Sequence, residues 1–230
     1  MIIDDKELPD YLIKFAERKE YLDDIINGKI YMKESGYFRK LEDNFRGDEL
    51  DGLYPIDAIK SKVSFVDVEI PPPSSMNVGF VGDDKIPMFC ATFYCHDILD
   101  KMDDDSYRMK IDVADELKKF GKYALIIHFG EFIYRIKEYA KNHDLYYRYG
   151  MINYSDKKFL MESIMHKTFD EQLDAFFKKD ISYKNQNEWR LILLKSDGSS
   201  LISEKSDSIT IEIDKLEGAT GSMSILWTII

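Results

Sequence analysis

The sequence predicts an α+β fold with a single domain over residues 1–230, in which helices flank a mixed, mostly antiparallel sheet. Expected strands outnumber expected helices, and the two types alternate irregularly along the chain. Residues 123–129 form an almost unbroken apolar run, typical of a central strand buried on both faces. A helix should follow Gly130, because apolar residues recur there at helical spacing: Phe132, Ile133, Ile136 and Tyr139.

The first fifty residues predict short elements separated by glycines. Residues 11–15 suit either a strand or a first helical turn, and apolar residues at helical spacing predict a helix over 17–27. Gly28 is placed to end that helix as its C′ residue. A short strand at 30–32 and a brief helix at 38–45 should follow, with Gly47 and Gly52 marking a loop.

The middle of the chain predicts strands interrupted by proline. Residues 63–70 alternate between apolar and polar and predict one strand, ended by three consecutive prolines that cannot donate to a ladder. Residues 71–77 are expected to form a Pro/Ser-rich loop. Strands at 78–81 and 86–95 should then be joined by a hairpin turn at 82–84.

The last third predicts a strand, a helical region and three further strands. An aromatic strand is expected at 145–154, followed by a mainly helical segment at 157–179. Strands should close the chain at 188–194, 209–213 and 225–230.

The charge of the chain narrows the classes of partner. A formal net charge of −11 disfavours nonspecific binding to phosphate backbones and to anionic membranes, so nucleic acid is an unlikely partner and a small molecule or a protein is expected. No apolar run is long enough to span a membrane. Acidic residues concentrate at 97–116, and the sequence allows either a mobile lid or a fixed helix face for this segment. The interleaved Lys101, Arg108 and Lys110 argue against a nucleic-acid-mimicking surface.

The cysteines and the N-terminus favour a cytoplasmic protein. On one strand, Cys90 and Cys95 would lie ~16 Å apart and face opposite ways, too far apart for a disulfide. Unpaired cysteines suit a reducing compartment. The first residues show neither the basic region nor the apolar core of a signal peptide.

The strongest candidate site lies at the start of the strand 188–194. Gln186 and Glu188 should share one face of that strand with Arg190, while Trp189 and Leu191 face the other way. A carboxylate at a strand edge near an arginine can stabilise a cationic transition state or bind ribose hydroxyls, and an amide two residues earlier can orient a nucleophile. The simpler alternative is a structural ion pair between Glu188 and Arg190.

The loop 46–52 offers two more candidates, Arg46 and Asp48, as polar residues of a cleft. The alternative is a turn fixed by aspartate side-chain hydrogen bonds. Its spacing does not match a calcium loop. The four histidines lack ligand spacing, so no metal site is expected, and His128 is expected to be a hydrogen-bonded core residue, with a catalytic base as the alternative.

Several of these segments resemble one family. Residues 21–32, 37–39, 46–52 and 183–190 are similar to a broad family of uncharacterised bacterial and phage cytosolic proteins with a late Q/E-x-E-[WYF]-R strand motif. The same Gln186-x-Glu188 motif distantly resembles the ADP-ribosyltransferases. That resemblance implies that Glu188 is a catalytic carboxylate and that NAD is the substrate. The chain departs from that family's pattern on the first strand, where the NAD-clamping Arg or His is missing or displaced: only Lys14 is basic there, with Arg18 just beyond. Ser35 is a weak counterpart of the Ser-Thr-Ser element.

Two functions follow as hypotheses. The first is an enzyme acting at the nicotinamide riboside bond of NAD, with Arg46 or Arg39 contacting phosphates and with aromatic walls drawn from Tyr31, Tyr37 or Trp189. The second is a noncatalytic module that binds a nucleotide or a protein, acting in phage–host conflict.

Overall fold

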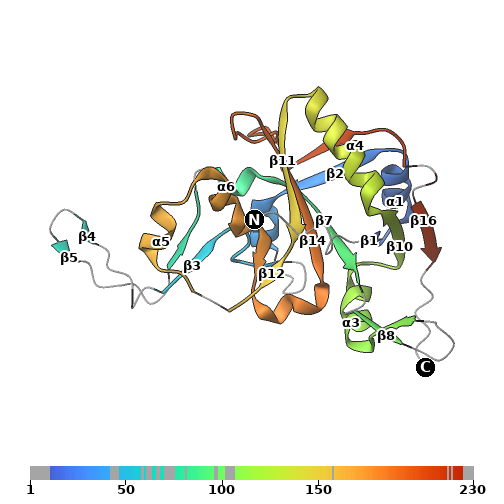
Figure 1. The fold of residues 1–230 in the computed structure, drawn as a ribbon, viewed down its shortest axis with the longest axis horizontal. Coiled ribbons are helices and arrows are strands. Elements are labelled where there is room, and N and C mark those ends of the chain that lie inside the picture. Colours follow the sequence, from blue (N-terminus) through green and yellow to red (C-terminus); the bar gives the residue numbers. More distant parts are fainter. Residues whose placement is uncertain are drawn as a thin grey trace.

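The protein is built around one curled antiparallel sheet, which confirms the predicted α+β class (Figure 1). The computed structural model describes residues 11–41, 47–57, 60, 64–65, 68–69, 76–80, 82–95, 98–101, 107–156, 158–216, 218 and 220–224. Six strands follow one another in the order β11-β14-β7-β1-β10-β16, and β2 joins the sheet between β7 and β15. The strands of this sheet are β1 (Tyr11–Ala16), β2 (Lys29–Glu34), β7 (Pro87–Tyr94), β10 (Tyr123–His128), β11 (Leu145–Met151), β14 (Glu188–Lys195), β15 (Ser208–Glu212) and β16 (Thr220–Ser224).

Helices cover the two faces of the sheet unequally. The larger core cluster packs α1 (Lys19–Ile26) and α4 (Phe129–Asn142) on one face, where Trp189 meets Phe129 and Phe132. On the other face, α3 (Ile111–Leu117) packs on β1 and β10, and the 3-10 helix η5 (Leu173–Phe177) packs on β7 and β14. The alternation of β14 is as predicted, with Trp189, Leu191 and Leu193 on the α4 side.

Short elements complete the described chain. The helices are α2 (Ser35–Lys40), α5 (Met161–Met165) and α6 (Phe169–Gln172), and the 3-10 segments are η2 (Asp83–Lys85), η4 (Lys118–Phe120) and η6 (Ile181–Gln186). The small strand pairs are β3 (Tyr54–Ile56) with β6 (Met76–Val78), β4 (Ser64–Phe65) with β5 (Val68–Glu69), β8 (Leu99–Lys101) with β9 (Tyr107–Met109), and β12 (Asn153–Tyr154) with β13 (Lys178–Lys179). Only β12 and β13 pair in parallel among the described strands.

Several local predictions are confirmed. Residues 11–15 belong to a strand, and α1 ends at Asn27 with Gly28 at a φ of +85°. A side chain at Gly28 would also meet the carbonyl of Ile213, 2.1 Å from an added Cβ. The turn therefore requires glycine both for its positive φ and for the lack of space. The helix expected after Gly130 is α4, which already begins at Phe129 and carries a Glu131–Arg135 pair at 2.8 Å.

Other predictions are wrong because tertiary pairing overrides local pattern. Within the predicted strand 63–70, Ser64–Phe65 and Val68–Glu69 are two separate strands that pair antiparallel, with Ser64 opposite Glu69. β6 ends at Val78 and pairs with β3, so no hairpin joins it to β7, and residues 83–85 form η2. The second helix begins at Ser35 instead of residue 38. The segment 157–179 contains three short helical pieces and β13.

His128 is also not a core residue. Its side chain is exposed and caps α4 by accepting from the Glu131 amide at 3.3 Å. In the acidic segment 97–116, the described residues form the β8–β9 pair and α3, whose Val113 and Leu117 are buried.

The predicted strand 225–230, the residues 71–75 of the predicted loop, and Arg46 lie outside the described residues. Met76 and Asn77, the end of that loop, belong to β6 instead. Cys90 and Cys95 are free thiols. None of the helices in the described ranges is long and apolar enough to cross a membrane.

Candidate functional site

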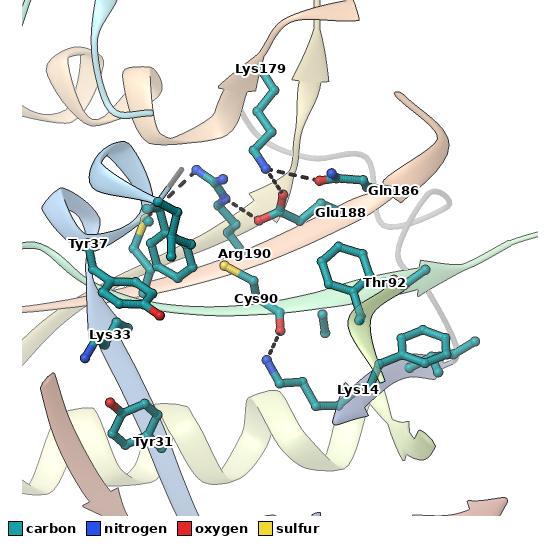
Figure 2. A pocket seen from close by; sticks show the side chains of 17 residues that line it. Lys14, Tyr31, Lys33, Tyr37, Cys90, Thr92, Lys179, Gln186, Glu188 and Arg190 are labelled. Atoms are coloured by element: carbon teal, nitrogen blue, oxygen red, sulfur yellow. Dashed lines mark hydrogen bonds and ion pairs between the residues drawn. The ribbon is translucent and has the colours of Figure 1, made fainter. Parts of the chain in front are cut away.

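A cavity of about 320 Å³ opens on the face of the sheet opposite α4 (Figure 2). Strands β1, β2, β7 and β14 supply its floor, with alternate residues of β2 and β14 but consecutive residues of β1 and β7 lining it. Helix α2 and the 3-10 helices η4 and η6 supply the rest of the wall. The polar lining residues are Lys14, Lys33, Cys90, Thr92, Lys179, Gln186, Glu188 and Arg190, and the aromatic ones are Phe15, Tyr31, Tyr37, Phe38 and Phe120.

Glu188 is held in the cavity wall by two cations. Its Oε1 accepts from Arg190 Nε at 2.6 Å and its Oε2 lies 2.8 Å from Lys179 Nζ. Burial by itself raises the pKa of Glu188, but Arg190 and Lys179 together outweigh it and leave the pKa well below its usual range. Glu188 is therefore a carboxylate at neutral pH, and the ion pair expected between Glu188 and Arg190 is present.

Arg190 anchors this carboxylate to the body of the protein. Its side chain is 1% exposed, and its two terminal nitrogens donate to both oxygens of Asp51 at 2.6 and 2.8 Å. A further bond reaches the carbonyl of Phe176 at 2.7 Å. The planar guanidinium can hold this arrangement because its donors lie in a fixed fork. Arg190 is thus fully engaged in positioning Glu188, although it lines the cavity.

Gln186 and Glu188 reach the same cavity by a route that the strand pattern did not predict. Gln186 is the last residue of η6, and Asn187 adopts a left-handed conformation with φ +44° before β14 begins. Asparagine adopts this conformation more readily than most residues, and its side-chain amide is held by the neighbouring strand β7, donating to the Phe93 carbonyl at 2.7 Å. β14 lies between β11 and β7, so the strand is buried in the sheet as its apolar residues indicate, and Glu188 lies at its start and not on an edge strand. Lys179 Nζ donates to Gln186 Oε1 at 3.1 Å, joining the amide to the carboxylate.

Tyr31 and Tyr37 also line the cavity as predicted, whereas the predicted Trp189, Arg39 and Asp48 do not. Tyr31 is 54% exposed and Tyr37 38% exposed, and Lys33 lies over the Tyr37 ring, 4.4 Å from its centroid. Figure 2 shows both tyrosines on the side of the cavity away from Glu188. Trp189 is buried on the opposite face of the sheet.

Arg39 and Asp48 belong to structural contacts. Arg39 pairs with Asp83 at 3.0 Å and does not line the cavity. Asp48 is buried in the turn before β3, where its Oδ1 accepts from the Leu50 amide at 2.9 Å, as the turn alternative predicted. Its Oδ2 has no hydrogen-bond partner among the described residues. Burial, chiefly, raises the pKa of Asp48.

Three lysines complete the site, and sequence reasoning did not assign them to it. Lys14 interrupts the otherwise apolar part of β1, which is a recognisable signal for a polar group facing something specific. Lys33 alternates with buried residues of β2 and pairs with Asp207 at 2.6 Å. Lys179 carries no comparable signal, because a lysine in the short strand β13, seven residues before Gln186, is not distinguished from a surface lysine by sequence alone.

The side chains that line this cavity suit a polar ligand that also carries an aromatic ring. Glu188 can accept from hydroxyl groups with its remaining lone pairs, while Lys14 and Lys33 are cations facing the same space. Comparisons with family models, with curated proteins and with solved structures give no match for this chain.

Proposed function

We propose that the cavity binds a nucleotide, with NAD as the first candidate, and that the reaction is transfer or hydrolysis at the nicotinamide riboside bond. The observation that carries the proposal is the position of an ionised Glu188 in the wall of a cavity that Tyr31 and Tyr37 line on another side. A ribose offers hydroxyls to the carboxylate, and a base or nicotinamide ring offers a flat face to the tyrosines.

In this proposal, each residue has a defined role. Glu188 accepts a hydrogen bond from a ribose hydroxyl and stabilises the positive charge that develops at the anomeric carbon as the glycosidic bond breaks. Gln186 orients the attacking group. Arg190 is a positioning residue, because its donors are already occupied by Glu188, Asp51 and Phe176. The distant resemblance of the Gln186-x-Glu188 motif to the ADP-ribosyltransferases supports the same assignment.

The size of the cavity fits part of such a ligand. A volume of about 320 Å³ lies at the lower end of ligand sites, so a mononucleotide portion would be enclosed and the remainder of NAD would extend past the tyrosines. The excess of acidic residues elsewhere does not oppose an anionic ligand here, since four of the five charged side chains in the lining are cations.

The test exposes the purified protein to NAD labelled in its adenylate half, with and without bacterial lysate. Nicotinamide release and label transfer are measured for the wild type, for Glu188→Gln and for Glu212→Gln, a control at an exposed glutamate on β15. We expect activity in the wild type and the control and its loss in a folded Glu188→Gln protein. Equal activity in all three proteins would overturn the role of Glu188.

The second candidate is noncatalytic nucleotide binding by the same cavity. One observation favours it: both oxygens of Glu188 are already engaged by buried cations, as in a structural ion pair. It predicts that nucleotide binds without turnover and that Glu188→Gln weakens binding only as far as it weakens folding. Nicotinamide release by the wild type, and not by a folded Glu188→Gln protein, would exclude this candidate.

A further inference from the structure

Lys14 lies where β1 and β2 diverge along the same edge of β7; this gap between the two strands is termed the fork. On one edge of β7, Ile13 pairs with Thr92 at one end, and Lys33 pairs with Met88 at the other. Between these points no described strand pairs with residues 89–91 on that edge. The carbonyl of Cys90 would be left without a ladder partner, and Lys14 Nζ reaches across the fork to donate to it at 2.5 Å (Figure 2).

The amine of Lys14 differs from every other cation of the cavity in its partners. Lys33 pairs with Asp207, Lys179 with Glu188, and Arg190 with both Asp51 and Glu188. Within the described ranges Lys14 has no carboxylate in contact. Its neighbours are a neutral carbonyl and the ring of Phe89, 4.6 Å from Nζ to the centroid.

The groups around Lys14 provide little countercharge. Burial, with a smaller effect from Glu188, raises the pKa of the Cys90 thiol to about 12, so this group is uncharged at neutral pH. Glu188 is shared between Arg190 and Lys179. Burial consequently lowers the pKa of Lys14, with Cys90 and Glu188 opposing the effect only in part. A lysine in such surroundings carries more of the neutral, nucleophilic amine than an exposed one.

We propose that Lys14 is a nucleophilic amine that condenses with a small hydroxylated aldehyde, the open-chain form of a sugar, bound in the cavity. The geometry that supports it is the gap between β1 and β2, which leaves room for the amine in the floor of a cavity whose lining also includes Thr92, Gln186 and Glu188, possible hydrogen-bond partners for hydroxyl groups. This inference does not depend on nucleotide binding.

The reaction is an ordinary condensation and consumes no oxidant or reductant. The Nζ lone pair attacks the carbonyl carbon, a C–N bond forms, and the carbonyl π electrons move to oxygen, which takes up a proton. The carbinolamine then loses this oxygen with the second amine hydrogen as water, leaving an imine. In sum, an amine and an aldehyde give an imine and one water.

The test treats the wild-type protein with glyceraldehyde and cyanoborohydride at pH 7, so that each imine is trapped as a secondary amine. Peptide mass mapping follows the rate at Lys14 against the rate at Lys137, an exposed lysine on α4 that serves as an internal reference. We expect Lys14 to react at least ten-fold faster. Propionaldehyde, which lacks hydroxyls, should reduce that preference.

A rate at Lys14 equal to or below that at Lys137 would overturn the proposal. No nucleotide is present in this assay, so its result stands apart from the NAD measurements. A Lys14→Arg variant keeps a donor for the Cys90 carbonyl but cannot form an imine, and its peptide should stay unmodified. If that variant fails to fold, the comparison within the wild-type protein still decides.

Discussion

Glu188 and Arg190 lie two residues apart on β14 and form a buried ion pair, with Arg190 Nε 2.6 Å from Glu188 Oε1. The pair is the centre of a network that extends to Asp51 on one side and to Lys179 and Gln186 on the other. This network fixes the carboxylate of Glu188 in the cavity wall. The stability of the protein and the geometry of its candidate site therefore depend on the same contacts.

Removing Arg190 should destabilise the protein strongly. Arg190→Met leaves Glu188 and Asp51 buried without their partner, and breaking a buried pair in this way costs about 3–5 kcal/mol. Urea unfolding followed by circular dichroism measures the loss. Arg18→Gln is the control, because the Arg18–Glu20 pair is exposed and should contribute less than about 1 kcal/mol. Similar losses in the two variants would contradict the central role of Arg190.

The contribution of Glu188 to stability should depend on pH in a defined direction. Its folded-state pKa lies below the unfolded value, so the stabilisation is complete above the unfolded pKa and is lost as pH falls toward the folded one. The difference in unfolding free energy between the wild type and Glu188→Gln should thus be largest near pH 6–7, well above the ordinary glutamate pKa of about 4.3, and shrink at lower pH. A difference that grew on acidification would show that the carboxylate is not stabilised by its cations.

The tyrosines at the cavity should contribute to ligand binding and little to folding. Stacking on an aromatic side chain is worth about 1–3 kcal/mol per base, so Tyr31→Ala and Tyr37→Ala should each weaken nucleotide binding about five-fold or more. Both residues are partly exposed, and their removal should leave the unfolding midpoint nearly unchanged. Isothermal titration measures the affinity. Tyr134→Ala, at an exposed position on α4, is the matched control and should bind like the wild type.

The cysteine of the cavity should react slowly in the folded protein. With a pKa of about 12, the Cys90 thiol supplies far less thiolate at pH 8 than an ordinary cysteine with a pKa near 8.5. Alkylation of Cys90 by iodoacetamide should then be slower by about a thousand-fold or more than in urea, as followed by mass mapping. Fast native alkylation would mean that the thiol is far less shielded than its surroundings imply.

Two glycines with the same backbone conformation separate strain from crowding. Gly28 and Gly82 have φ angles of +85° and +83°, but only at Gly28 would an added Cβ meet another atom within 4 Å. Gly82→Ala should cost about 1–2 kcal/mol from the left-handed conformation alone, and Gly28→Ala should cost clearly more. Urea unfolding of the two variants measures the difference. Equal losses would show that the Ile213 contact relaxes without cost.

Local patterns in the sequence predicted much of the fold and part of the site. The apolar run of β10, the amphipathic α4 and the Gly28 helix end were each encoded within a few residues, so they could be predicted. The pairing of β6 with β3 could not, because it depends on which strands meet in space.

The site shows the same division between local and long-range information. Gln186, Glu188 and Arg190 form a short recognisable motif, and Tyr31 and Tyr37 were placed with it as aromatic walls. Lys179 is only seven positions from Gln186, but no local pattern marks it as buried against Glu188. Asp51, which holds Arg190, lies 139 positions away along the chain.

The most direct measurement is an isothermal titration of the purified protein with NAD, comparing the wild type with Tyr31→Ala and Tyr134→Ala. The account predicts binding of one NAD per chain to the wild type and to Tyr134→Ala, and weaker binding to Tyr31→Ala. An absence of binding to the folded wild-type protein at millimolar NAD, or equal affinity in all three proteins, would contradict the assignment of the cavity as a nucleotide site.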